Sequence, residues 1–330
     1  MAATHPKHAG FDVIPTTFKQ VGEHDIRVDV LVPQKAAPGK RPVIVRFHGG
    51  GLVMGDSLYA DFWPHWLSDL ALNHNAIVIS PNYRFMPQAT GLEIWSDVED
   101  FWTWLRSGAV ESLLKSHSTP TEPDPDRILL AGESAGGLLS VNAGLAHPDD
   151  VRAITALYPA LNPADKDFAE PRTEVFPFNT RTPECTIREV LSSAPSGPVS
   201  SSIEPRYLPL MLAAIEHGKI GPWYVRGSVG EEAKERLDEL FPGRRLEKPG
   251  VKIPKGGITI IQGAQDSVVP PGHSEPFVKR AREVLRGQDG GDKIALVLQA
   301  GEHGFDGDLR YHEEEWLREA LKTAVEAWLE

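Results

Sequence analysis

The sequence predicts an α/β fold in which a doubly wound, mostly parallel sheet carries an inserted, mainly helical cap. Apolar strand-like runs alternate with amphipathic helical segments up to about residue 160, and the alternation returns after residue 256. An irregular stretch rich in proline, serine and charge lies between them. Such alternation favours a parallel sheet covered by helices on both faces. We therefore expect a sheet domain formed by residues 1–160 and 256–330, with residues 161–255 as a cap over the carboxyl edge of the sheet.

Seven segments have the length and composition of strands. The first, residues 25–32, alternates between apolar and polar residues as a half-buried strand would. The others are short apolar runs typical of strands that are buried on both faces. These six runs cover residues 42–47, 76–80, 127–131, 153–157, 257–262 and 293–299.

Seven further segments repeat apolar residues at helical spacing. The last one places Trp316, Leu321 and Trp328 on one face, and its acidic first turn suits the helix dipole. Two of the seven fall in the expected cap, and of these the first is apolar enough to line a pocket and the second polar enough to face water. The predicted helices cover residues 61–72, 93–105, 136–146, 207–217, 231–241, 276–285 and 313–329.

The charge and composition exclude several classes of function. The 330 residues carry a formal net charge of -12, and no basic stripe could neutralise the phosphates of a nucleic acid. The first 17 residues lack the apolar run of a signal peptide, and no later run is long enough for a membrane span. Cys185 is the only cysteine, which excludes an internal disulfide and is interpreted as a small apolar filler. We expect a cytoplasmic protein with no membrane span, and the sequence leaves a homodimer open.

The strongest chemical motif is Gly132-Glu133-Ser134-Ala135-Gly136. It fits G-x-S-x-G and lies between a predicted strand and a predicted helix, the setting in which this motif presents a nucleophilic serine. The glycines would allow a tight turn that holds Ser134 exposed in a strained conformation. The alternative is a serine that only caps the following helix.

A nucleophilic serine needs a base within hydrogen-bond reach and an acid that orients the base. In folds that carry this motif, both follow the serine in the chain, each on a loop after a strand. Asp266 follows the strand predicted at residues 257–262, and His303 follows the one at 293–299. The competing residues are Asp289, Asp292 and Asp306 for the acid, and His273 and His312 for the base. None of these competitors lies at the equivalent strand end, so Ser134, Asp266 and His303 are the expected catalytic residues.

A glycine-rich loop after the second predicted strand can supply donors for an oxyanion. His48-Gly49-Gly50-Gly51 lets the main chain approach a substrate closely. We expect the N–H groups of Gly50, Gly51 and Ala135 to form the oxyanion hole, and His48 to be structural. The alternative is an ordinary flexible turn.

Together, the His-Gly-Gly-Gly loop, Gly132–Gly137 and the late Asp266 and His303 resemble the hormone-sensitive-lipase-like branch of the α/β-hydrolase fold. Three further segments resemble that family: residues 82–87, which read Asn-Tyr-Arg-Phe-Met-Pro, residues 124–127 and the pair 158–159. Glu133 departs from the aspartate common in bacterial members. The strands begin near Phe11, so N-terminal cap helices are expected to be absent and the cap to come mainly from the insertion.

This resemblance implies a serine carboxylesterase that hydrolyses a small or medium, largely apolar ester through an acyl-enzyme. The same triad could instead serve an acyltransferase, or a pathway-specific hydrolase or amidase of secondary metabolism. A non-catalytic small-molecule receptor is disfavoured because His303 is retained. Histidines and carboxylates lack metal-ligand spacing and no phosphate-binding motif occurs, so neither metal nor cofactor is expected. The residues proposed to wall the substrate pocket are Leu52, Phe62, Trp63, Tyr207 and Met211.

Overall fold

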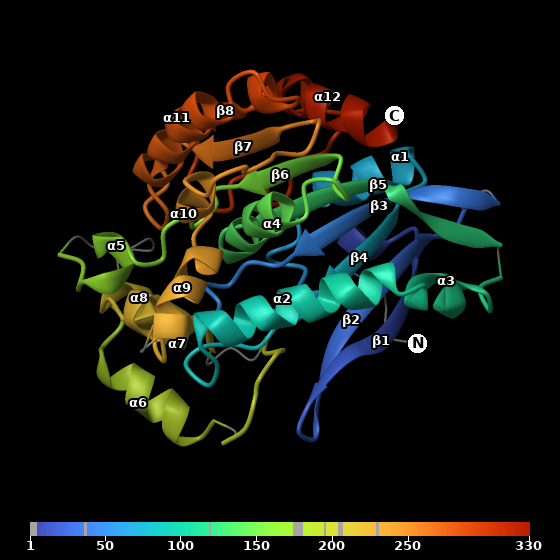
Figure 1. Cartoon of the computed structure of the whole chain (residues 1–330). Coiled ribbons are helices and arrows are strands. Elements are labelled where there is room, and N and C mark those ends of the chain that lie inside the picture. The colour runs from blue at the N-terminus through green and yellow to red at the C-terminus, as the bar shows by residue number, and fades with distance from the viewer. Residues whose placement is uncertain are drawn as a thin grey trace.

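The computed structural model describes residues 5–35, 38–118, 120–173, 181–194, 196–203, 207–228 and 231–330, the last without the side chains of 231–235. Its centre is one eight-stranded sheet in the order β1-β2-β4-β3-β5-β6-β7-β8 (Figure 1). Strand β2 pairs antiparallel with both β1 and β4, and every other neighbouring pair is parallel. The predicted mostly parallel sheet is therefore confirmed.

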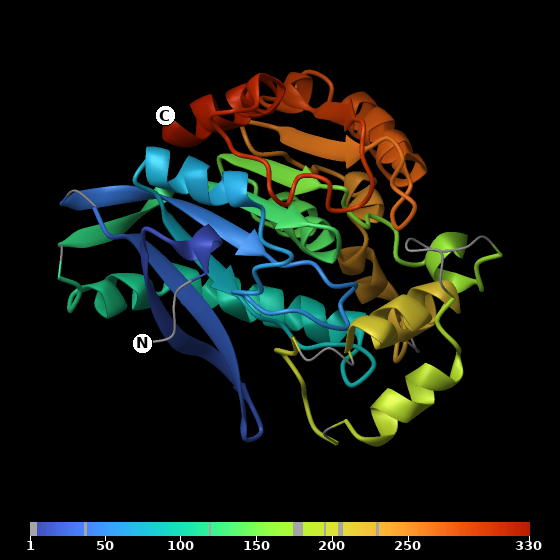
Figure 2. The ribbon, with the colours of Figure 1, turned by 180° about the vertical axis from the view of Figure 1, so that it is seen from behind.

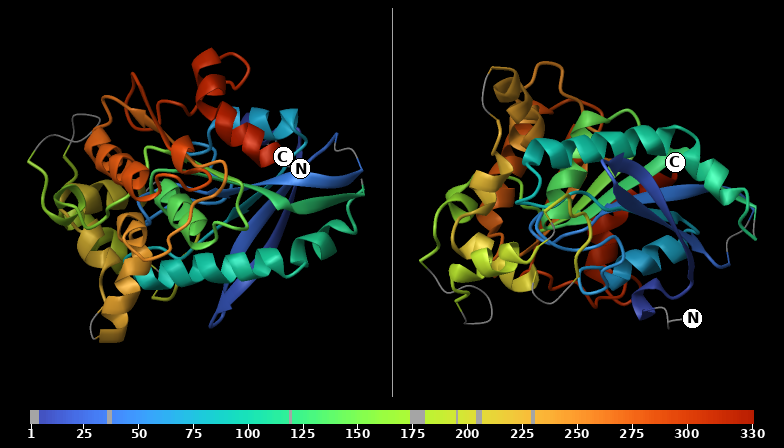
Figure 3. Two further views of the ribbon diagram at one scale, coloured as in Figure 1. Left: turned by 45° about the horizontal axis from the view of Figure 1, so that its top comes forward. Right: turned by 90° about the horizontal axis from the view of Figure 1, so that it is seen from below.

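The strands agree with the predicted segments to within two residues, except at the start of the chain, in β3, which begins three residues early, and in β5. Strand β1, which the sequence indicated only by its start, forms a long hairpin with β2, set at an angle to the central strands in Figure 3. Strand β5 begins six residues early because its first part pairs with residues 39–41 of β3. The strands are β1 (Phe11–Val21), β2 (His24–Pro33), β3 (Gly39–Phe47), β4 (Ile77–Pro81), β5 (Thr121–Glu133), β6 (Ala153–Leu157), β7 (Ile258–Gly263) and β8 (Ala295–Gln299).

Helices cover both faces of the sheet, as Figure 2 shows from behind. Successive strand residues point to opposite faces, so Ile44 packs in one apolar cluster with α1 (His65–Asn73) and α12 (Glu315–Leu329). Its neighbours Val43 and Val45 pack in the other cluster, with α2 (Gly91–Arg106), α4 (Ala135–Ala146) and α11 (Ser274–Val284). Helix α1 begins at His65 rather than at residue 61, because Pro64 occupies its N-cap position in an extended conformation. A short helix that was not predicted, α3 (Ala109–Leu114), follows α2.

The chain between β6 and β7 lies beyond the carboxyl ends of the strands (Figure 1). It contains the two predicted helices, α7 (Tyr207–Glu216) and α9 (Glu231–Leu240), and four short ones. Helices α9 and α10 pack against α2, α4 and α11 of the sheet domain. Because these helices pack closely against the sheet domain, the proposed boundary of a separate cap at residues 161–255 stays a prediction. The short helices are α5 (Lys166–Ala169), α6 (Cys185–Ser192), α8 (Ile220–Tyr224) and α10 (Pro242–Leu246).

Two sequence expectations concern the surface. Cys185 is exposed at the start of α6, so its interpretation as an apolar filler is wrong. No helix in the described ranges combines the length and the apolar character that crossing a bilayer requires.

Candidate active site

The predicted nucleophile lies in a sharp turn between β5 and α4. Ser134 has φ 55° and ψ −118°, a left-handed conformation that side chains rarely adopt, and its N–H donates to the Leu157 carbonyl at 2.9 Å. A Cβ at Gly136 would lie 2.0 Å from the backbone oxygen of Phe47, and one at Gly132 would lie 2.3 Å from that of Gly136. Only glycine fits at these two positions, and the turn therefore packs tightly beneath Ser134.

The predicted acid and base meet on two loops that follow neighbouring strands. Asp266 follows β7 and His303 follows β8, and the two are hydrogen-bonded, with Nδ1 of His303 2.9 Å from Oδ2 of Asp266. The other oxygen of Asp266 accepts from the backbone N–H groups of Val268 and Val269, at 2.9 and 2.8 Å. These contacts fix a completely buried carboxylate against the ring of His303, whose side chain is 20% exposed.

The competing carboxylates lie elsewhere or have other partners. Asp306 is buried beside the site but accepts from Trp66 Nε1 and from the Tyr158 hydroxyl, both at 2.8 Å. Burial raises the pKa of Asp306. Asp289 and Asp292 precede β8, at the opposite end of the strand from His303.

Neither competing histidine contacts Asp266. His273 Nε2 lies 3.1 Å from Asp167 Oδ2, and His312 Nδ1 lies 3.6 Å from a carboxylate oxygen of Asp69. Asp167 and His273, together with Asp165, are the one group of potential metal ligands within the described ranges. Asp165 also caps α5, and none of these three residues lines the cavity described next.

Ser134 and His303 line the same cavity of about 690 Å³. The hydrogen bond between the Ser134 hydroxyl and His303 is not formed in this structure. Catalytic hydrogen bonds of free enzymes are often long and tighten only when substrate binds. The Tyr158 ring packs against the imidazole of His303, with ring centroids 4.4 Å apart, and limits how far the base can turn.

The predicted oxyanion donors border the same cavity. Gly50 and Gly51 have φ values of 107° and 62°, and Gly50 accepts from the N–H groups of Val53 and Met54 in a tight turn. Together with Ala135, both glycines line the cavity. In the described part of the chain, the N–H groups of these three residues donate to no protein acceptor, which leaves them free for a ligand.

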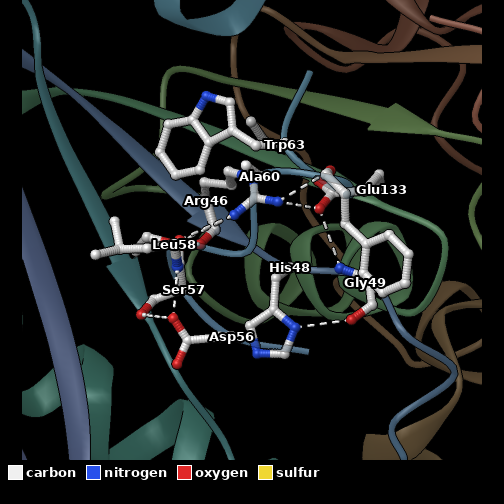
Figure 4. Close-up of polar contacts among 12 residues, drawn as sticks. Arg46, His48, Gly49, Asp56, Ser57, Leu58, Ala60, Trp63 and Glu133 are labelled. Carbon is white, nitrogen blue, oxygen red and sulfur yellow. Dashed lines mark hydrogen bonds and ion pairs between the residues drawn. The ribbon is translucent and has the colours of Figure 1, made fainter. Parts of the chain in front are cut away.

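Beneath the glycine loop lies a buried polar cluster that Figure 4 shows. Glu133, directly before the nucleophile, forms an ion pair with the fully buried Arg46 and accepts from the N–H of Gly49 at 3.0 Å. Burial raises the pKa of Glu133 to about 7, although Arg46 opposes the shift. Burial also lowers the pKa of His48 to about 4, so its ring is neutral and Nδ1–H donates to the Gly49 carbonyl at 2.7 Å. This supports the structural role expected for His48. Sequence reasoning missed the Arg46–Glu133 pair, although an arginine within an apolar strand was a usable signal.

Three of the five residues proposed for the pocket line the cavity: Leu52, Phe62 and Met211. Trp63 does not, because its ring packs under Arg46 in the core and its Nε1–H donates to the Ser68 hydroxyl.

Tyr207 is also wrongly placed in the pocket, being buried in the core at 3% exposure. The cavity face of α7 begins one residue later. Of this face, sequence reasoning named Met211 and missed the other three residues, Leu208, Leu212 and Ile215.

Comparison with known proteins agrees with this geometry. Residues 44–206 match a family model described as the alpha/beta hydrolase fold. The chain is 32% identical over 325 residues to a probable carboxylesterase of Phoma sp., covering 94% of both chains. It is also 32% identical over 160 residues to arylacetamide deacetylase of Bos taurus, covering 46% of this chain and 36% of the relative. An esterase structure from Mycobacterium marinum, 19% identical, has a TM-score of 0.60 over 98% of this chain and 83% of its own. The chain therefore belongs to the α/β-hydrolase family, in the hormone-sensitive-lipase-like group that contains carboxylesterases.

Proposed function

We propose that the protein is a serine carboxylesterase that hydrolyses small or medium, largely apolar esters. The observation that carries the proposal is the hydrogen bond between His303 and Asp266 at the cavity that also holds Ser134. A serine, a histidine oriented by a carboxylate and unoccupied N–H donors around one cavity are the parts that acyl transfer needs. The relationship to a probable carboxylesterase over nearly the whole chain supports the same reaction.

The reaction proceeds in two acyl-transfer steps. His303 Nε2 accepts the proton of Ser134 as the hydroxyl attacks the ester carbonyl, while Asp266 stabilises the imidazolium. The N–H groups of Gly50, Gly51 and Ala135 bind the oxyanion of the tetrahedral intermediate. The intermediate collapses to an acyl-enzyme as His303 protonates the departing alcohol. Water, activated by the same histidine, then releases the acid.

The walls of the cavity support an uncharged, apolar substrate. A volume of about 690 Å³ is in the middle of the range for small-molecule sites. Aliphatic and aromatic side chains from the insertion, helix α4 and the acid loop make most of the wall. They include Leu138, Phe168, Leu208, Met211, Leu212, Ile215, Ile220, Val268 and Val269.

An acyl-enzyme can also transfer its acyl group to an alcohol or amine, the alternative function considered from the sequence. Product analysis in the presence of added alcohols distinguishes the two outcomes. Hydrolysis that continues undiminished under those conditions favours the esterase. A cytoplasmic location and a homodimer stay predictions, which imaging of the tagged protein and size-exclusion chromatography would test.

The proposal is tested with p-nitrophenyl esters from two to twelve acyl carbons. The wild type should show turnover, with kcat/KM highest at short to medium chains because the cavity is finite. Ser134→Ala should lower kcat by roughly 10⁶-fold, and Asp266→Asn by roughly 10⁴-fold. Asp289→Asn is the matched control, since that carboxylate lies at the other end of β8, and it should leave kcat unchanged. A wild type without burst or turnover on any of these esters, but with tight binding of a small molecule, would contradict the proposal.

A further inference from the structure

Buried side chains hold the backbone of Gly49 on both sides, as Figure 4 shows. Its N–H donates to Oε1 of Glu133 at 3.0 Å, and its carbonyl accepts from Nδ1 of His48 at 2.7 Å. His48 is itself fixed, because Tyr83 stacks on its ring and donates its hydroxyl to the His48 carbonyl at 2.6 Å. The next two residues, Gly50 and Gly51, present the free N–H groups at the cavity. The Gly49 carbonyl belongs to the same planar peptide group as the Gly50 N–H, so these hydrogen bonds fix the backbone at the first proposed oxyanion donor.

Arg46 connects Glu133 to the later part of the loop between β3 and α1. The guanidinium forms an ion pair with Oε1 of Glu133 and donates to the backbone oxygens of Ser57 and Phe62, at 3.2 and 3.1 Å. The guanidinium carbon Cζ of Arg46 lies 4.4 Å from the centre of the Trp63 ring. Arg46 comes from β3 and Glu133 from the end of β5. The pair therefore joins two strands to the loop between β3 and α1, at its start through Gly49 and further along through Ser57 and Phe62. The carboxylate is also one residue from Ser134, which fixes the loop relative to the nucleophile.

Burying this polar cluster has a free-energy cost that a purely structural role does not explain. Arg46 and Glu133 are exposed by 0% and 4%, and Arg46 Nε and Glu133 Oε2 have no hydrogen-bond partner among the described residues. A buried ion pair is often no more stabilising than apolar residues of the same volume, because desolvation offsets the attraction. Unpartnered buried polar atoms add a further cost. Departures of this kind are expected where function requires the groups.

We propose that Glu133, held in place by Arg46, is a positioning residue that fixes the backbone at Gly49 through its N–H and thereby aims the N–H groups of Gly50 and Gly51 at the oxyanion. The inference rests on the proposed esterase function. Glu133 borders the cavity, but its hydrogen bonds go to Arg46 and Gly49, and none joins it to Ser134 or His303. Its effect on the reaction is therefore indirect, through the loop.

Two substitutions at Glu133 distinguish the effect of losing the hydrogen-bond acceptor from the effect of losing the negative charge. Glu133→Gln keeps an oxygen that accepts from Gly49, whereas Glu133→Leu removes it. Removing one oxyanion donor costs about 10²- to 10³-fold in kcat, and misplacement by about 1 Å costs about 10²-fold. Glu133→Leu should therefore lower kcat by about 10²-fold with KM changed less than about threefold, while Glu133→Gln should lose less than about tenfold.

A tetrahedral mimic gives a second readout. An alkyl trifluoromethyl ketone adds to Ser134 and places an oxyanion in the hole, whereas the free carboxylic acid product does not. Both Glu133 variants should bind the ketone more weakly than the wild type, and Glu133→Leu by the same factor by which it lowers kcat/KM. Inhibition by the product should stay within about threefold, because ground-state contacts are unchanged.

Asp97→Asn serves as the control for loss of a buried charge. Asp97 is completely buried and paired with Arg84, but it does not line the cavity. This variant should melt at a lower temperature and keep the wild-type kcat at 25 °C. Wild-type kcat in Glu133→Leu, or a raised KM with unchanged kcat, would overturn the inference. Should Glu133→Leu fail to fold, an unchanged ketone affinity in Glu133→Gln would overturn it instead. In each case an active wild type and an inactive Ser134→Ala leave the esterase proposal standing.

Discussion

Burial changes the proton affinity of several side chains around Ser134. It raises the pKa of Glu133 to about 7 and also raises the pKa of Asp306, whereas it lowers that of His48 to about 4. Asp266 is buried as well, and several hydrogen-bond donors face it. Two backbone N–H groups and the Gln262 amide face it in addition to His303. Burial thus shifts the pKa values of Glu133, Asp306 and His48, each toward the neutral form.

The raised pKa of Glu133 predicts a pH-dependent stability. The groups facing its carboxylate are Arg46, the Gly49 N–H and, at longer range, Asp306. Because the folded-state pKa lies above the unfolded value near 4.5, folding favours the protonated form. This contribution is fully present below about pH 4.5 and is lost as the pH rises through about 7. Relative to Glu133→Gln, the wild type should lose roughly 3 kcal/mol of unfolding free energy over that interval.

Urea unfolding of both proteins at intervals of half a pH unit measures this difference. A difference between wild type and Glu133→Gln that is constant from pH 5 to 8, or that changes in the opposite direction, would contradict the prediction.

The loop after β7 depends on a residue of the insertion. Arg172 donates to the carbonyl oxygens of Ser267 and Val268, at 2.7 and 2.8 Å, and to that of Asp167 at 2.9 Å. The same loop turns the N–H groups of Val268 and Val269 toward Asp266. A single guanidinium therefore connects the insertion to the loop that holds the proposed acid.

Arg172→Met should lower kcat by about tenfold, because the loop would no longer hold Asp266 against His303 in one orientation. Arg226→Met is the control: Arg226 also bonds from the insertion to the sheet domain, at the carbonyl of Pro87, but not at the acid loop. An equal change of kcat in Arg172→Met and Arg226→Met would contradict the prediction.

Long elements were predictable because several turns or a full strand of apolar spacing accumulate in them. Helices α2 and α12 each bury one clear face, and the central strands are continuous apolar runs. The short helices α5, α6, α8 and α10 have eight residues or fewer, too few for a helical repeat of apolar residues to be recognised. Their formation depends on packing against the rest of the chain rather than on local pattern.

At the candidate site, positions after strand ends were predictable and side-chain directions were not. Chain order alone pointed to Asp266 and His303, which the structure brings together. Trp63 and Tyr207 were wrong because an aromatic residue near a pocket can equally face the core, and nothing in the sequence around them distinguishes the two directions. The Arg46–Glu133 pair joins positions 87 residues apart, a contact that only the folded sheet creates.

For the molecule as a whole, electrostatics should favour some substrates over others. The chain carries a formal net charge of -12. Apart from His303, every ionisable acid or base lining the cavity in the described ranges is a carboxylate or a tyrosine: Asp61, Glu133, Tyr158 and Glu302. Asp61 and Glu302 are exposed, so salt screens their field. No lysine or arginine among the described lining residues offsets them.

An ester with a negatively charged acyl chain should therefore react more slowly than a neutral one of equal length, and more so at low salt. The pair to compare is the p-nitrophenyl monoester of glutaric acid and p-nitrophenyl pentanoate, since both have five acyl carbons. The screening length falls from about 30 Å at 0.01 M salt to about 3 Å at 1 M. Two unit charges in close contact in water interact by about 1 kcal/mol. The kcat/KM of the neutral ester divided by that of the charged ester should therefore fall by roughly fivefold over this range. A cationic choline ester should show the opposite salt dependence. A ratio that ignores salt would mean that the acidic surface does not act at the cavity, and that apolar walls alone exclude charged substrates.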